Sequence, residues 1–120
     1  MQRSDTCFVK IAAFDKAVNK LREPGRARVL SRANEFEQVW KKSRSDEDIP
    51  PGFCLDQLAH RQGRYRVVEI RVAAWRIALM ILEDVSRAYW IHTWRKTGAR
   101  NPQDVDLAVD RAKTLYEHFR

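Results

Sequence analysis

Three cations cluster around one predicted strand end in the segment IHTWRKTGARNP, which lies in the last third of the chain. They are Arg95, Lys96 and Arg100, and His92 and Trp94 precede them. Such side chains suit a phosphate group, because the planar guanidinium of arginine donates to two oxygens at once and stays charged at any relevant pH. The segment is therefore either the rim of a phosphate-binding site or a solvated turn.

His92 is the residue in this segment that could move a proton. Its ordinary pKa, about 6.5, suits a general acid or base. Alternation along a strand, however, groups it with Trp90 and Trp94 in a partly buried aromatic row, where it would be structural. Trp94 leaves a similar choice open, since it could stack on an unpaired base or pack in the core.

Two more arginines are predicted to share one sheet face. Alternation in residues 74–82 puts the most apolar set on one face and Arg76 on the other, where Arg71 of the preceding strand would join it if the register permits. Between residues 61 and 100, nine Lys and Arg stand against three acids. This concentration of charge is typical of a surface for a polyanion. The alternative is a solvated face on which arginines pair with acids such as Glu69.

Hydrophobic periodicity predicts the elements that must hold these residues, with a 3.6-residue stripe in helices and alternation in strands. The predicted elements are a strand at 6–13, helices at 14–21 and 26–42, a loop at 43–53, strands at 64–72, 74–82 and 87–95, and a helix at 102–119. Asn101 is a suitable N-cap for the last helix, with Pro102 at its first position. The pattern predicts an α+β fold, in which a short N-terminal strand and two helices precede an antiparallel three-strand meander and a C-terminal helix packed on one sheet face. The first two helices would cover the apolar face of the meander.

The chain of 120 residues is long enough for a single domain, and we expect residues 1–5 to be flexible. Its net charge of +7 favours polyanionic or acidic partners. Cys7 and Cys54 lie far apart without zinc-ligand spacing, so we expect reduced thiols and no metal. With neither a signal peptide nor an apolar run long enough to span a bilayer, the sequence predicts a cytoplasmic protein without a membrane partner.

Three motifs in this order resemble the RelE/HigB superfamily of type II toxin–antitoxin toxins, and within it the HigB-like, phage-derived branch. They are Glu69-Ile70-Arg71, Trp75-Arg76-Ile77 and the segment from His92 to Pro102. The last matches the form His-x-Phe-x-Lys-Lys-x-x-Lys-x-Pro, with the spacing from histidine to proline kept. Thr97 replaces its second lysine and Arg100 its third, and the last helix lacks the early tyrosine that some relatives use.

The resemblance implies an endoribonuclease, an mRNA interferase that works without metal or small-molecule cofactor. Such toxins cleave mRNA, typically on the ribosome, through the substrate's own 2'-hydroxyl, and thereby inhibit translation. The implied catalytic residues are Arg76, Lys96, Arg71 and His92. The residues implied to contact RNA are Arg66, Arg95, Arg100 and Trp94. The implied partners are mRNA, the ribosome and a cognate antitoxin, often a helix-turn-helix protein.

Two other functions are compatible with the same motifs. One is that of the ParE-like branch, which inhibits DNA gyrase without cutting RNA. The other is nucleic-acid binding by a relative that has lost turnover, which Thr97 and the missing tyrosine favour.

Overall fold

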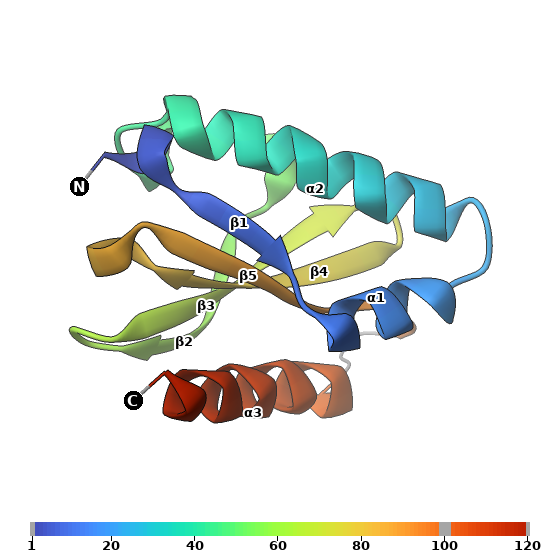
Figure 1. Ribbon diagram of the computed structural model, residues 1–120. Helices are drawn as coiled ribbons and strands as arrows, with labels where there is room; N and C mark the ends of the chain where they lie inside the picture. The colour runs from blue at the N-terminus through green and yellow to red at the C-terminus, as the bar shows by residue number, and fades with distance from the viewer. Residues whose placement is uncertain (1, 99–101, 120) are drawn as a thin grey trace.

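The computed structural model describes residues 2–98 and 102–119, which form one sheet with helices on both faces (Figure 1). The elements are β1 (Cys7–Lys10), α1 (Ala12–Asn19), α2 (Gly25–Lys42), β2 (Asp56–Arg61), β3 (Tyr65–Val72), β4 (Trp75–Leu82), β5 (Arg87–Arg95) and α3 (Pro102–His118). The sheet has the order β1-β5-β4-β3-β2, in which β1 runs parallel to β5 and the other neighbours are antiparallel. The predicted α+β class and the predicted order of elements are confirmed.

The sheet has one strand that the sequence did not predict. Strand β2 has the sequence DQLAHR, which contains no β-branched residue and does not alternate. It forms the edge of the sheet beside β3, and its register shifts between Gln57 and Ala59. A bulged edge strand buries little, so periodicity gives no signal for it. The predicted three-strand meander is therefore a meander of four strands.

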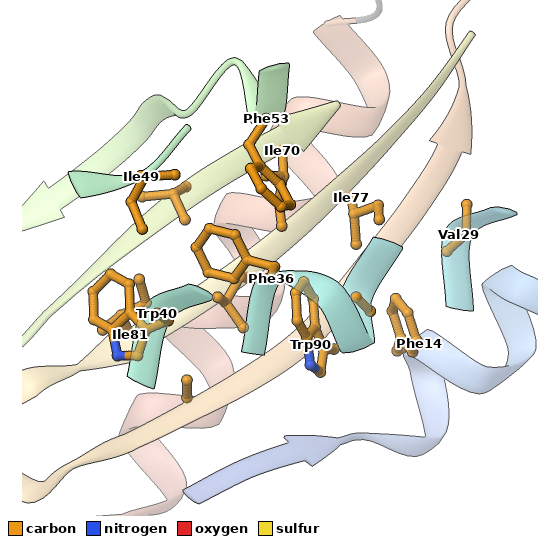
Figure 2. Close-up of a cluster of buried hydrophobic side chains, with 14 of the residues drawn as sticks. Phe14, Val29, Phe36, Trp40, Ile49, Phe53, Ile70, Ile77, Ile81 and Trp90 are labelled. Carbon is orange, nitrogen blue, oxygen red and sulfur yellow. The ribbon is translucent and has the colours of Figure 1, made fainter. Parts of the chain in front are cut away.

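Helix α2 covers one face of the sheet because its buried residues recur at helical spacing. Val29, Ala33, Phe36 and Trp40 form one stripe along the helix. They pack with apolar residues of β3, β4 and β5 (Figure 2), namely Val68, Ile70, Ile77, Leu79, Ile81, Ala88 and Trp90. The ring of Phe36 lies 6.0 Å from that of Trp90 between ring centroids. A fully buried Val, Leu, Ile or Phe side chain contributes about 1.5–3 kcal/mol by leaving water, so this cluster fixes the sheet under α2 as predicted.

Helix α3 packs on the opposite face of the sheet (Figure 1). Its fully buried residues are Ala108 and Ala112, whose small side chains let the helix approach the strands closely. They pack with Val67, Ala78, Met80, Tyr89 and Ile91. The polar residues of this face lie nearer the β3–β4 turn and outside that apolar cluster. The fold thus buries one half of the face and leaves the other half for polar side chains.

An irregularity in β5 reverses the alternation on which one prediction rested. Ala78 of β4 pairs with His92 but Leu79 pairs with Trp90, so Ile91 is an extra residue between them. An extra residue exchanges the faces of every side chain beyond it. Trp90 therefore belongs to the cluster under α2, whereas Trp94 lies in the cluster under α3. The predicted row that placed Trp90 with His92 is wrong for this reason.

Among the described residues, no helix is both long enough and apolar enough to cross a membrane.

The segment 43–53, predicted as a loop, contains two short 3-10 turns, Asp46–Asp48 and Pro51–Phe53. A further 3-10 turn occupies Arg3–Asp5, while flexibility of residues 1–5 stays a prediction.

Candidate nucleic-acid interface

The candidate site is built on the β3–β4 hairpin and the end of β5. Arg71 and Arg76 are cross-strand partners, which is the register that the sequence analysis required for them to share a face. Arg76 is also the partner of Trp94 across the next pair of strands. A short turn at Ala73 and Ala74 joins the two strands and keeps the arginines adjacent. This face is the one that α2 does not cover.

Arg76 is held rigidly although it carries a charge. Its side chain is only 8% exposed, and its Nη1 donates to the carbonyl oxygens of Ala73 and Trp75, both at 3.0 Å. Thr93 of β5 donates to the carbonyl oxygen of Arg76 at 2.7 Å. Burial, and then the charge of Arg71, lower the pKa of Arg76, yet an arginine remains charged at neutral pH. The result is a fixed cation that is largely shielded from solvent.

Glu69 is the carboxylate beside this cation. Its Oε2 lies 3.9 Å from the Nε of Arg76, and its side chain is 14% exposed. Asp56 of β2 is its cross-strand partner and belongs to the same face. Burial raises the pKa of Glu69 and Asp56 adds to the rise, whereas Arg76, Arg71 and Lys96 oppose it. Glu69 therefore binds a proton more readily than an ordinary glutamate does.

The remaining cations of the C-terminal segment lie on different sides of the sheet. Lys96 is half-buried, its backbone N–H donates to the carbonyl oxygen of Ala74 at 2.7 Å, and its charge acts on Glu69. Arg95 is exposed and pairs with Trp75, which packs on the side of α2. The structure thus brings Lys96 to the pair of arginines and places Arg95 at the rim. Arg100 and the predicted cap Asn101 lie outside the described residues.

His92 links β5 to α3. Its Nδ1 lies 3.0 Å from the Nη1 of Arg111, and its Nε2 lies 2.9 Å from Oδ1 of Asp104. A guanidinium can only donate, so Nδ1 accepts and the proton of the neutral ring sits on Nε2, from which it is donated to Asp104. Burial, with an added contribution from the charge of Arg111, lowers the pKa of His92, although Asp104 opposes the shift. The neutral ring stacks on Trp94 at 5.3 Å between centroids.

Arg66 and Trp94, two predicted RNA contacts, have partners within the protein. Arg66 faces the side of α2, at the far end of β3 from Arg71, and its guanidinium bonds Asp46 at 2.6 and 2.9 Å. It also lies 2.8 Å from Glu83. The structure therefore does not bring Arg66 to the other candidates. Trp94 is buried, with 5% of its surface exposed, so little of its ring is open to a base.

Arg32 of α2 is a residue of this region that the sequence analysis missed. Its Nε donates to the carbonyl oxygen of Arg71 at 3.1 Å, and its Nη2 donates to that of Gly52 at 2.7 Å. The guanidinium also lies 3.7 Å from the ring centroid of Phe53. It therefore joins α2 to the end of β3 and to the turn before β2. These partners are distant in the sequence, so no local pattern could have indicated them.

Within residues 2–98 and 102–119, no group of three or more His, Cys, Asp and Glu side chains could hold a metal ion. What the described residues offer is a fixed arginine, Arg76, an exposed arginine, Arg71, a lysine and a carboxylate that holds a proton readily. Such a set can bind a phosphate and assist a proton transfer beside it.

Comparison with known proteins identifies the fold. No protein-family model matches the chain, and no curated protein matches its sequence. A chain of the archaeal RelE–RelB complex from Pyrococcus horikoshii OT3 is similar in structure, with a TM-score of 0.58 and 14% sequence identity. The match covers 79% of this chain and 99% of that one. The protein therefore has the RelE-like fold that its motifs predicted, while the HigB-like branch stays a prediction.

Proposed function

We propose that the protein is the toxin of a type II toxin–antitoxin system and an mRNA interferase that cleaves ribosome-bound mRNA. The observation that supports this most directly is the cross-strand pair of Arg71 and Arg76, with Glu69 and Lys96 beside it, on a RelE-like fold. The pair offers two guanidinium groups to one phosphate. An exposed Arg71 next to a buried Arg76 suits a ligand that reaches the site from solvent.

The proposed reaction needs three contributions from the protein. The 2'-oxygen of the substrate attacks the adjacent phosphorus, a new P–O2' bond forms and the P–O5' bond breaks. The proton of the 2'-hydroxyl must leave, the extra negative charge of the phosphorane must be stabilised, and the departing 5'-oxygen must gain a proton. The products are a 2',3'-cyclic phosphate and a 5'-hydroxyl, so no co-reactant is required.

Arg76 is the proposed stabiliser of the phosphorane. Hydrogen bonds to the carbonyls of Ala73 and Trp75 already fix its plane, so little reorganisation accompanies the reaction. Its burial strengthens the attraction to a developing charge, since that attraction grows as the local dielectric falls. When the phosphate of the substrate binds, it would replace the carboxylate of Glu69 as the anion nearest to Arg76.

Glu69 is the proposed acceptor of the 2'-hydroxyl proton. It lies at the arginine pair and its pKa is raised, which brings the carboxylate closer in basicity to the group it must deprotonate. His92, the other predicted acid–base residue, has both ring nitrogens bound to Asp104 and Arg111, which supports a structural role. Lys96 is proposed to neutralise the charge on the leaving 5'-oxygen and to supply the proton that this oxygen gains.

The test is cleavage of a reporter mRNA by the purified protein on purified ribosomes. We expect the wild-type protein to cut the message, and the Arg76→Ala protein, checked for folding by circular dichroism, to leave it intact. If the folded wild-type protein gives no cleavage product, the proposed activity is wrong. A gyrase supercoiling assay on the same preparation tests the ParE-like alternative.

A second candidate is an RNA-binding relative without turnover. The observation that favours it is the engagement of both ring nitrogens of His92, together with Thr97 at a position where the motif has lysine. If the protein has this function, it binds RNA but gives no cleavage product under any condition. The ribosome assay combined with a binding measurement therefore separates it from the toxin.

We further propose that the protein acts in the cytoplasm and pairs with a cognate antitoxin, as the protein in the similar structure forms a complex with RelB. The basic face with Arg71 is the surface that an inhibitor would have to cover. Expression of this chain should arrest growth, and the product of an adjacent small gene should restore it. Growth arrest that no neighbouring product relieves would argue against this pairing.

A further inference from the structure

A second basic surface lies beside the candidate site. It is a notch of about 360 Å³ between α1, the end of β5 and the first half of α3. Its cationic lining residues are Lys16 of α1, Lys20 directly after α1, Arg95 of β5 and Arg111 of α3, and Asp104 is the one carboxylate among the described lining residues. Figure 1 shows α1 next to the start of α3 at this edge of the sheet. The volume is within the range of ordinary ligand pockets.

His92, Asp104 and Arg111, which form the floor of the notch, are held by hydrogen bonds, and the carboxylate of Asp104 already has a partner. Asp104 accepts the hydrogen bond from His92 at 2.9 Å. Arg111 donates through Nη1 to the carbonyl oxygen of Ile91 at 3.1 Å and to Nδ1 of His92. The charges of Arg111 and Lys20 both act to lower the pKa of His92, after the larger effect of burial. The hydrogen bond and the charge of Asp104 oppose this lowering. Among the described lining residues four cations face this single carboxylate, so the notch carries a net positive charge.

The notch and the candidate site meet at the end of β5. Trp94 lines the notch and is the cross-strand partner of Arg76. Arg95 and Lys96 follow it, one on each side of the strand. We propose that the notch binds the sugar–phosphate backbone of single-stranded RNA next to the phosphate held by Arg71 and Arg76. The identity of this ligand rests on the proposed function, because RNA is the polymer expected at the adjacent site.

RNA fits the notch better than an acidic protein segment does. An RNA chain carries a phosphate on every nucleotide. If one phosphate is bound at Arg76, the neighbouring nucleotides must pass the end of β5, so their phosphates reach either Lys96 or the notch. The cations of the notch come from three separate elements and surround a concavity, which matches a flexible anionic chain. An acidic segment of a partner has no such link to the arginine pair.

The test uses lysines whose removal should not disturb folding. Lys16 and Lys20 are exposed, so Lys16→Gln/Lys20→Gln removes two charges from the notch only. The control is Lys42→Gln/Lys113→Gln, which removes two exposed lysines elsewhere. Binding of a short RNA with 2'-O-methyl riboses, which cannot be cleaved, is measured by fluorescence anisotropy across about 0.05–0.3 M KCl. Each lost phosphate contact should reduce the slope of log Kd against log salt by about 0.7.

We expect the notch variant to lose about 1.4 from this slope and the control to lose almost none. Equal changes of the slope in both variants would overturn the proposal, because RNA binding would then depend only on the net charge of the protein. It is also overturned if wild-type protein binds no RNA, or if the notch variant loses an acidic partner protein while its RNA slope is unchanged. Cleavage is a separate readout: a wild-type protein that binds RNA through the notch but never cleaves refutes only the proposed activity.

Discussion

At the scale of single residues, the environment of Arg76 matters more than its charge. Its plane is fixed by two carbonyl oxygens at 3.0 Å, and its neighbours are Arg71 and Glu69. A lysine at this position would keep a positive charge but lose the planar fork that can hold two phosphate oxygens while bonded to the turn. The geometry of the guanidinium is therefore the property to test.

We expect Arg76→Lys to slow cleavage of ribosome-bound mRNA by roughly 100- to 1,000-fold, which is the usual cost of one preorganised donor to a transition state. Single-turnover kinetics with purified ribosomes give the rate. Arg64→Lys, at an exposed position in the β2–β3 turn, is the control and should cleave normally. A rate for Arg76→Lys within about threefold of the wild type would show that charge alone suffices.

Glu69 should make the fold less stable at neutral pH. Its pKa is raised in the folded protein, so the folded state favours the protonated form, and the contribution to stability is present at acidic pH and lost as pH rises through the folded pKa. Glu69→Gln mimics the protonated form. We expect a higher free energy of unfolding at pH 7 and no gain at about pH 3, measured by urea denaturation.

The control for this prediction is Glu117→Gln, which changes an exposed carboxylate near the end of α3. It should leave the urea midpoint unchanged at both pH values. Because Glu69 is also the proposed proton acceptor, Glu69→Gln should lose cleavage while it gains stability. A variant that is less stable than wild type at pH 7 would mean that attraction to Arg76 outweighs burial.

The sequence put Arg71 on the face of Arg76 only on the condition that the register permitted it. The structure fulfils that condition, because the short turn leaves few registers for the two strands. The sequence did not predict which residues of the protein bind the side chains of His92 and Arg66. The partners of His92, Asp104 and Arg111, come from a helix whose orientation depends on packing. Arg66 is likewise bonded to Asp46 in a loop, so only the folded chain shows that it is unavailable.

At the scale of elements, α2 supports the hairpin that carries the arginine pair. Arg32 bonds the carbonyl oxygen of Arg71, while Gly25, about two helical turns earlier, lies against the indole of Trp75. Trp75 directly precedes Arg76. One helix thus holds both strands of the hairpin from behind, and changes on α2 should reach the site through the backbone.

Gly25→Ala is expected to destabilise the protein by roughly 1–3 kcal/mol, because it forces side chains apart in a packed core. A Cβ at this position would lie 2.5 Å from Nε1 of Trp75, so the indole must move. Gly52→Ala is the matched control, since its Cβ would meet Arg32 at 3.7 Å, an ordinary contact. Equal urea midpoints for the two variants would show that Trp75 can shift at no cost and that α2 does not fix the hairpin.

Elements with strong periodicity were predictable, and those defined by pairing were not. The stripe from Val29 to Trp40 defines α2 without help from the rest of the chain. Strand β2 and the extra residue Ile91 depend on hydrogen bonds with neighbouring strands. The sequence therefore predicted the face of Arg76 correctly, while alternation misplaced Trp90, on the other side of the irregularity.

At the scale of the whole molecule, Asp46 connects segments that are remote in sequence. It accepts hydrogen bonds from Arg3 near the N-terminus at 2.8 Å and from Arg66 of β3 at 2.6 and 2.9 Å. Arg3 also covers the ring of Trp40 at 3.7 Å. The cations that the sequence distributes along the chain are thus divided between a structural group around Asp46 and the open face with Arg71.

Asp46 should make the stability depend on pH in the acidic range. The hydrogen bonds from Arg66, with those from Arg3, lower its pKa from 3.8 to about 2, although burial opposes them. A lowered pKa in a folded acid contributes stability that is present above the ordinary value and lost as pH falls through the folded value. Its side chain is 41% exposed, so solvent screening reduces the effect to about 1 kcal/mol.

We therefore expect Asp46→Asn to unfold at a lower urea concentration than wild type at pH 7 and the two proteins to converge near pH 2. Asp110→Asn, at an exposed position on α3, is the control and should match wild type across the range. A constant difference between Asp46→Asn and wild type down to pH 2 would mean that the loss comes from packing around Arg3 and Arg66. Because Asp46 lies apart from the arginine pair, cleavage at pH 7 should survive the substitution, which separates the structural cations from the proposed RNA-binding ones.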